Sequence, residues 1–131
     1  MSFVYGNKSK QRLSECAEPL QILMNKVLEE TEHDITILCG SRSKEEQDAA
    51  YAAGNSKLKY PRSKHNQTPS LAVDVAPYPI DWKDIAAFKE LGALVKRTWD
   101  SMSQAEKEGY TLSWGGDWKS FKDMPHYELR K

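Results

Sequence analysis

Short strand-like segments, separated by longer helical ones, are the feature that most restricts the fold of this chain. Four segments of four to six residues are rich in β-branched, aromatic or other apolar side chains, as strands are. They are residues 35–39, 71–76, 110–114 and 126–129. Strands this few and short build only a small sheet, which must be covered by helices to bury a face. The expected fold class is therefore α+β, with helices packed on a small, mostly antiparallel sheet.

Three helical patterns lie between or before these segments. Residues 9–31 carry apolar side chains at helical spacing with Pro19 inside, so we expect a kink or a short leading helix. Ser43, three residues before a glutamate, begins the pattern of a capping box and predicts a second helix. Asp81 is expected to cap a long third helix over about residues 82–107.

Composition limits what the chain can do. Its 131 residues have the length of one domain, and we expect a single domain over residues 1–131. Nineteen basic and nineteen acidic residues cancel, so no global field favours nucleic acid or an anionic membrane. No apolar run reaches the roughly 20 residues of a membrane helix, so no membrane insertion is expected. Two cysteines, Cys16 and Cys39, cannot build a disulfide framework and are expected to be buried free thiols. The protein is expected to be a monomer.

The chemistry suggested by the sequence lies in two histidines and two aspartates. Asp74 stands in the middle of an otherwise apolar strand, where a buried carboxylate must be paired or bind a metal. His65 ends a polar loop nine residues earlier, and His126 follows His65 by 61 residues. Two imidazoles and one carboxylate are the protein ligands of an open tetrahedral zinc site. Asp123, three residues before His126, is near enough in sequence to take a proton from a water there.

At these residues the sequence resembles a family of zinc peptidases. The family includes D-Ala-D-Ala carboxypeptidases, D-Ala-D-Ala dipeptidases and phage L-alanyl-D-glutamate endopeptidases. Its signature of S-x-H, A-x-D and a distant E/D-x-x-H is matched by Ser63-x-His65, Ala72-x-Asp74 and Asp123-x-x-His126. Two further segments resemble the family and its phage lysin branch, namely Gly40-Ser41-Arg42-Ser43 and Trp114-Gly115-Gly116-Asp117-Trp118. Aspartate at position 123, where the carboxypeptidases have glutamate, is itself a mark of the endopeptidase branch.

The resemblance implies a Hedgehog/DD-peptidase-like fold and one Zn²⁺ per chain. By that resemblance, the metal ligands are His65, Asp74 and His126. Asp123 would act as general base and then as general acid, and Arg42 would stabilise the oxyanion of the transition state.

Other residues are expected to have supporting roles. Glu128 shares a strand face with His126 by two-residue alternation, so we expect it to orient that ligand, and Ser63 to help in the same way. Trp114 and Trp118 either line a substrate groove or fix their own loop. The basic residues of segment 57–64 form a solvated loop or steer an anionic wall polymer.

The function implied is that of a phage-type endolysin. It would be a zinc-dependent peptidoglycan endopeptidase that cleaves the L-alanyl–D-glutamate bond of the stem peptide. Because the N-terminus lacks a signal peptide, the enzyme would wait in the host cytoplasm and reach the wall through a separate membrane pore. The catalytic pattern extends to within five residues of the C-terminus, so no separate wall-binding domain is expected.

Two alternatives stay open. The same chemistry on another bond would make the chain a D-Ala-D-Ala carboxypeptidase or dipeptidase. An inactive, zinc-structured cell-wall-binding module belongs to a different class, but it would have no need of Asp123 and Arg42 beside an open metal position. A nucleic-acid binder is disfavoured by the zero net charge.

Overall fold

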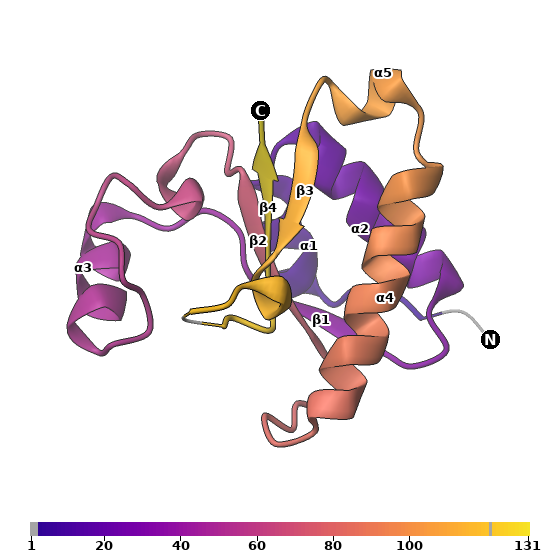
Figure 1. Cartoon of the computed structure of the whole chain (residues 1–131), viewed down its shortest axis with the longest axis horizontal. Helices are drawn as coiled ribbons and strands as arrows, with labels where there is room; N and C mark the ends of the chain where they lie inside the picture. The colour runs from indigo at the N-terminus through magenta and orange to yellow at the C-terminus, as the bar shows by residue number, and fades with distance from the viewer. Residues whose placement is uncertain (1–2, 121) are drawn as a thin grey trace.

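The computed structural model describes residues 3–120 and 122–131. In chain order its elements are α1 (Asn7–Ser14), α2 (Glu18–Glu30), β1 (Ile35–Cys39), α3 (Lys44–Ala52), η1 (Lys64–Asn66), β2 (Ala72–Pro77), α4 (Ile85–Ser101), α5 (Gln104–Lys107), β3 (Thr111–Trp114), η2 (Gly115–Asp117) and β4 (His126–Arg130). Figure 1 shows the sheet in the middle, with α2 and α4 on one side and α3 with its flanking loops on the other.

The four strands form one sheet in the order β1-β2-β4-β3, and every pairing is antiparallel. Side chains alternate between its faces, as they do in any strand. Val73, Val75, Tyr127 and Leu129 point into the hydrophobic core. The residues between them, which include Asp74, point to the other face. The expected α+β class with a small antiparallel sheet is confirmed.

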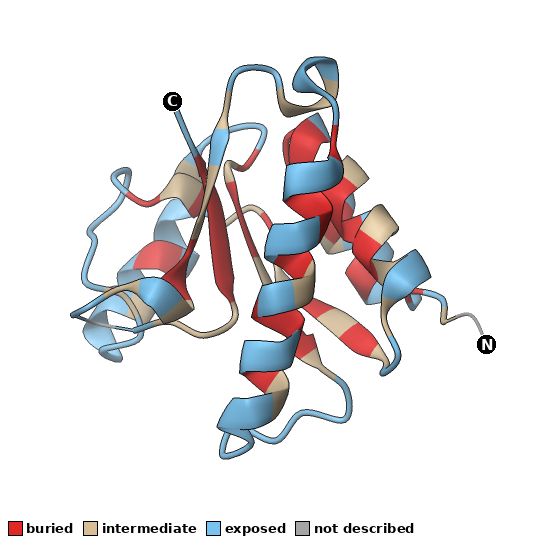
Figure 2. Cartoon of the chain, turned by 45° about the vertical axis from the view of Figure 1, so that its right-hand side comes forward, coloured by how far each residue is buried: buried red, intermediate tan, exposed pale blue. Residues whose placement is uncertain are grey.

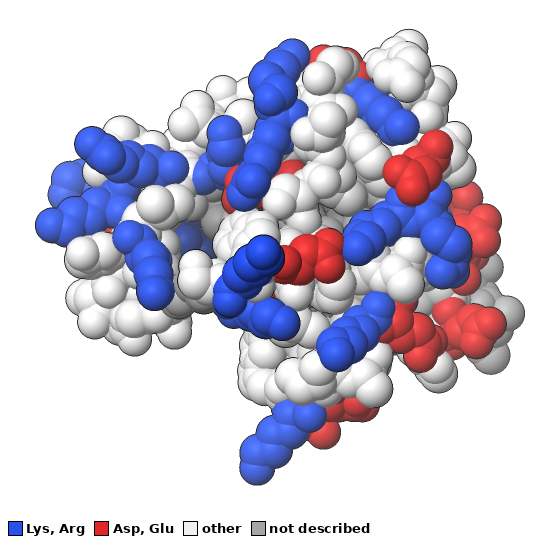
Figure 3. Space-filling view, viewed as in Figure 1, with Lys and Arg blue, Asp and Glu red and all other residues white. Residues whose placement is uncertain are grey.

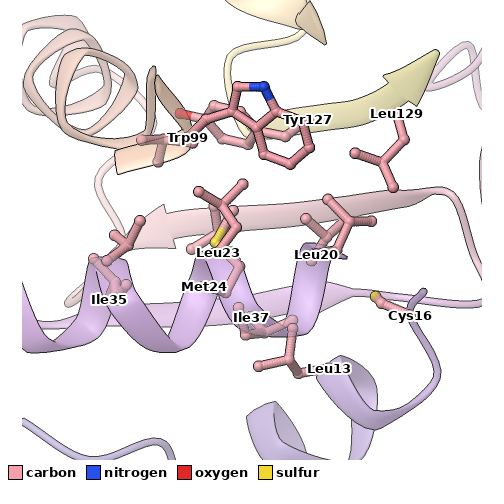
Figure 4. Close-up of a cluster of buried hydrophobic side chains, with 14 of the residues drawn as sticks. Leu13, Cys16, Leu20, Leu23, Met24, Ile35, Ile37, Trp99, Tyr127 and Leu129 are labelled. Carbon is pink, nitrogen blue, oxygen red and sulfur yellow. The ribbon is translucent and has the colours of Figure 1, made fainter. Parts of the chain in front are cut away.

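Helices α2 and α4 cover the apolar face of the sheet. Figure 2 shows that buried positions lie along the sides of these helices that face the strands. Leu20, Leu23 and Met24 of α2 are fully buried, and Trp99 of α4 belongs to the same hydrophobic cluster as Tyr127 of β4 (Figure 4). Burying such apolar side chains, at about 25 cal/mol per Å², is the main force that holds the two layers together. The large apolar side chains of β2 and β4 in the core cluster, Val73, Val75, Tyr127 and Leu129, therefore lie on one side of the sheet.

Most helix boundaries follow the sequence pattern. The expected break in the first helical segment is confirmed, because α1 ends at Ser14 and Pro19 lies in the first turn of α2, where its missing N–H costs nothing. The capping box at Ser43 is also present, with its hydroxyl accepting from the Glu46 N–H at 3.2 Å.

The third helix differs from its prediction. Asp84, not Asp81, caps α4, and its carboxylate accepts a hydrogen bond from the Ala87 N–H at 3.1 Å. Asp81 instead accepts from Lys83 N in the preceding turn. The helix also stops at Ser101, because Ser103 starts a second capping box that opens α5. None of the helices in the described residues is both long and apolar enough to cross a membrane.

Helix α3 stands apart from this core. Gln47 is its only buried residue, and its amide donates to the Leu58 carbonyl at 2.6 Å and to Ser56 Oγ at 3.0 Å. We call residues 42–66, which include α3 and η1, the polar lobe. Hydrogen bonds rather than apolar packing hold the polar lobe together.

Candidate metal centre

The sheet brings two of the predicted ligands together. Asp74 of β2 pairs directly with His126 of β4, so both side chains project from the face opposite the core. The third ligand, His65, comes from η1 in the polar lobe, and its ring is almost completely buried. The Ser63 hydroxyl caps this turn by accepting from the His65 N–H at 3.2 Å. Ser63 therefore orients the backbone of His65 rather than its ring.

Three ligand atoms converge on one point. His65 Nε2 lies 3.2 Å from Asp74 Oδ1 and 3.3 Å from His126 Nδ1, and His126 Nδ1 lies 3.1 Å from Asp74 Oδ1. A tetrahedron whose corners lie about 2.0 Å from a central zinc has edges of about 3.3 Å. The spacing of the three atoms therefore fits a tetrahedral metal ion.

The outer ring nitrogens have partners of their own. His65 Nδ1 lies 2.7 Å from the Gly40 carbonyl oxygen, and His126 Nε2 lies 2.7 Å from Glu128 Oε1. Both partners only accept hydrogen bonds, so each outer nitrogen must carry the proton. In a neutral imidazole the inner nitrogen is then left with a lone pair. Two such lone pairs and a carboxylate oxygen face one another, which requires a positive charge between them.

The pKa shifts reflect the same arrangement. Burial alone would lower the pKa of both rings, but the Asp74 carboxylate, together with Cys39 at His65 and Glu128 at His126, outweighs it and raises the pKa of His65 to about 10 and that of His126 to about 9. Burial would raise the pKa of Asp74, yet the two rings hold it far below its usual range. Without a metal the cluster therefore takes up protons instead.

Cys39 joins this cluster, which the sequence did not indicate. Its sulfur lies 3.7 Å from His65 Nδ1, and Cys39, His65 and Asp74 offer ligand atoms within 4.8 Å of one another. A bulge between Ile37 and Cys39 shifts the register, so that Cys39 pairs with Asp74 instead of continuing the core-facing row. Its sulfur approaches the outer nitrogen of His65, so it lies behind the ring and outside the three converging atoms. Cys16 is a buried free thiol as expected, whereas Cys39 is only partly buried.

Asp123 lies beside the cluster without joining it. Its Oδ2 is 3.9 Å from His126 Nδ1, and its side chain is 28% exposed. Burial and the neighbouring Asp74 charge raise the pKa of Asp123. The loop before it approaches so closely that a Cβ on Gly115 would lie 2.2 Å from the Asp123 carbonyl oxygen. Asp123 is therefore held at the edge of the cluster by a close backbone contact.

Arg42 reaches the cluster from the polar lobe. Its Nη2 lies 3.8 Å from Asp74 Oδ2, the carboxylate oxygen that does not face the histidines. Its Nη1 donates to Gln47 Oε1 at 3.0 Å, and its backbone N–H donates to the His65 carbonyl at 2.8 Å. The guanidinium is thus fixed beside the candidate metal ligands.

Glu128 lies behind His126, on the same strand face, as alternation predicts. One of its oxygens accepts from His126 and the other accepts from Arg130 Nε at 2.8 Å. Burial raises the pKa of Glu128, but these two hydrogen bonds outweigh burial and lower it. The carboxylate is therefore charged and fully engaged.

The two tryptophans have different surroundings. Trp114 is buried in the core, where it stacks on Tyr127 and donates to the Met124 carbonyl at 2.7 Å. Its burial and this hydrogen bond favour the alternative in which Trp114 fixes its own loop over the one in which it lines a substrate groove. Trp118 is partly exposed, and its ring centroid lies 5.2 Å from that of His126.

A separate cavity lies away from the metal cluster. A cavity of about 580 Å³ separates α4 from the start of β1, and none of the predicted site residues lines it. His33 lies there, exposed and 3.9 Å from Glu90. His33 is thus a surface residue that lies outside the candidate metal centre.

Comparisons with known proteins agree on one family. Residues 1–130 match the family model described as phage L-alanyl-D-glutamate peptidase. Over 104 residues the chain is 36% identical to the peptidoglycan L-alanyl-D-glutamate endopeptidase CwlK of Bacillus subtilis. This aligned stretch covers 73% of this chain but only 60% of CwlK. The crystal structure of the L-Ala D-Glu endopeptidase ChiX of Serratia marcescens is similar with a TM-score of 0.76 and 26% identity, over 97% of this chain and 90% of ChiX.

Proposed function

Because the chain belongs to the phage L-alanyl-D-glutamate peptidase family, we propose that it is a zinc-dependent peptidoglycan endopeptidase. Its substrate is the stem peptide, and the bond it cleaves joins L-alanine to D-glutamate. The enzyme acts as a phage endolysin from a single catalytic domain. The alignment with CwlK covers 60% of that protein, so the activity of the whole relative is carried over here as part of the proposal.

One observation carries the proposal, namely the convergence of one ligand atom each from His65, Asp74 and His126, 3.1–3.3 Å apart. These residues would hold the zinc, and their spacing and donor types suit it. When bound, zinc would lower the pKa of a water and polarise the carbonyl of the scissile bond. Three protein ligands leave a fourth position for that chemistry.

The other side chains supply proton transfer and charge. Asp123 stands at the open edge of the cluster, where its carboxylate takes a proton from the attacking water and returns it to the leaving amine. Its raised pKa suits a group that must hold and then release a proton. Arg42 carries a fixed positive charge beside the cluster, where it stabilises the negative oxygen that develops on the substrate.

The test is mass spectrometry of the fragments released from purified peptidoglycan. The zinc-loaded protein should release stem peptides with a new D-glutamate N-terminus and leave L-alanine on the muramic acid. Chelator should abolish release, added zinc should restore it, and His126→Ala should release nothing. Loss of a terminal D-alanine would instead identify a carboxypeptidase. No release by a zinc-loaded, folded protein would favour a wall-binding module.

A further inference from the structure

Three side chains beside the metal cluster form a closed ring of contacts with the ligand His126, and the proposed reaction assigns none of the three a step. His126 Nε2 donates to Glu128 Oε1, and Arg130 Nε donates to Glu128 Oε2. The Arg130 guanidinium lies 5.7 Å from the centre of the Trp118 ring, and that ring packs on His126. Because residues 126, 128 and 130 alternate along β4, all three share one face of the sheet.

Arg130 determines what Glu128 can do. A carboxylate with one anchored oxygen can still rotate, whereas one with both oxygens anchored has a single orientation. The Glu128 side chain is only 10% exposed, so water does not readily replace a lost partner on Oε2. The orientation of Glu128 in turn fixes the His126 ring and keeps the proton on Nε2, so that Nδ1 faces Asp74 with a lone pair.

The same contact contributes little to the stability of the fold. The Arg130 side chain is 51% exposed, and ion pairs with an exposed partner are weak because water screens them. Arg130 is also the one exposed residue of β4, so its side chain is not part of the hydrophobic core. The contact is better explained by what it does to His126.

We propose that Arg130 is a positioning residue of the metal centre: by holding Glu128 against His126, it sets the geometry and affinity of the bound metal. The proposal rests on the zinc site of the proposed function. It assigns to Arg130 no contact with substrate and no proton transfer.

The experiment measures zinc dissociation constants by chelator competition in the full chain. Arg130→Ala should weaken zinc binding about tenfold, at the lower end of the range for groups that orient a ligand. Arg130→Lys should recover part of the loss, because it keeps the charge but not the fixed direction of Nε–H. Lys131→Ala is the matched control, since this neighbour has the same charge but contacts Tyr110 and the Glu108 carbonyl.

A double-mutant cycle tests whether Arg130 affects zinc binding through Glu128. If Arg130 acts through Glu128, Arg130→Ala should have no further effect, within about twofold, once Glu128 is already Ala. The melting temperature of the metal-free Arg130→Ala protein should match that of the wild type.

Four results would overturn the proposal. An unchanged zinc affinity in Arg130→Ala removes Arg130 from the metal centre and leaves the proposed function intact. Equal losses in Arg130→Ala and Lys131→Ala, or a full loss in the Glu128→Ala background, assign the effect to charge or to another route. A wild-type protein that binds no zinc overturns both this proposal and the proposed function.

Discussion

At the scale of single residues, the proposed zinc and protons would compete for the same two nitrogens, His65 Nε2 and His126 Nδ1. Without metal, the pKa of His65 is raised to about 10 and that of His126 to about 9. Both values lie above the ordinary value near 6.5, so protonation stabilises the metal-free fold below about pH 6.5, and this contribution is lost as the pH rises through about 9–10. Zinc binds only the unprotonated nitrogens, so its affinity rises over the same interval.

The difference between zinc-loaded and metal-free melting temperatures should therefore grow with pH. At one fixed concentration of free zinc, we expect a larger increase at about pH 8.5 than at about pH 6. Thermal unfolding followed by circular dichroism measures it. The His126→Ala protein provides the baseline, and an increase that is constant with pH would contradict proton competition at these rings.

Asp123 is expected to move protons without holding the metal. Asp123→Asn keeps the shape but removes the base, so kcat should fall about 10²–10⁴-fold. Zinc content, measured by elemental analysis, should stay near one per chain. Asp117→Asn is the control on the same loop, because Asp117 is exposed and pairs with Lys96. Near-normal turnover in the Asp123 variant would show that the base is another group.

Arg42 has two possible uses, since it contacts Asp74 and also lies where substrate charge would develop. If it stabilises the oxyanion, Arg42→Ala should lower kcat about 10²–10³-fold at saturating zinc, and Arg42→Lys should recover only part. The melting temperature should change little. If it only supports Asp74, the variant should instead lose zinc affinity and stability while the loaded enzyme turns over normally. Kinetics and unfolding of one preparation separate these results.

At the scale of elements, the close contact between η2 and the loop before β4 has a testable effect. A Cβ on Gly115 would lie 2.2 Å from the Asp123 carbonyl oxygen and 2.9 Å from its Cβ. Gly115→Ala must therefore push the Asp123 backbone away, at a cost of about 1–3 kcal/mol in stability. We expect kcat to fall as well, because Asp123 moves with its backbone.

Gly6→Ala is the control for this substitution, since a Cβ on Gly6 would meet nothing within 4 Å. Denaturant unfolding and kinetics measure the two effects. A Gly115→Ala protein with normal stability and turnover would mean that the loop tolerates the displacement and does not hold Asp123 in place.

The sequence predicted those features of the fold that depend only on residues close together in the chain. Strands, the Pro19 break and the Ser43 capping box follow from neighbouring residues, and the structure confirms them. The start of α4 did not follow, because Asp81 and Asp84 both have capping side chains, and only the packing of the helix selects between them. Trp114 likewise could not be assigned without knowing that Tyr127 lies beside it.

The site divides in the same way. The family signature named His65, Asp74 and His126, and these are the residues whose ligand atoms converge. Cys39 was not foreseen, because its approach to His65 depends on a bulge that a strand pattern does not reveal. The contact of Arg130 with Glu128 was not foreseen either, because the predicted strand covered residues 126–129, whereas β4 continues to Arg130.

At the scale of the whole molecule, charge is unevenly distributed although the total is zero. Figure 3 shows basic side chains gathered over α3 and the following loop, at the left of the view, where few acidic ones are visible. Lys59 and Arg62 belong to this loop and are exposed. His65 is three residues beyond Arg62, so the basic surface adjoins the metal cluster. Such a surface raises the encounter rate with an anionic polymer.

Removing two of these charges should slow the attack on intact cell walls. The double variant Lys59→Gln/Arg62→Gln is expected to lower kcat/KM about three- to tenfold at low salt and not at high salt, where charges are screened. Lys89→Gln/Arg97→Gln is the matched control, because both residues are exposed on α4, on the opposite side of the sheet. A loss that persists at high salt would exclude electrostatic steering.

The polar lobe and the sheet are joined at the metal ligands. His65 belongs to the lobe, whereas Asp74 and His126 belong to the sheet, and α3 adds no apolar side chain to the core. A bound ion would therefore link the polar lobe, which has few apolar contacts, to the sheet, which packs on the hydrophobic core. Without the ion, the polar lobe would unfold locally more easily than the sheet. The part of the protein that opens most easily would then be the part that supplies His65 to the proposed metal site. In this architecture the zinc proposed above would join two parts of the protein as well as take part in the reaction.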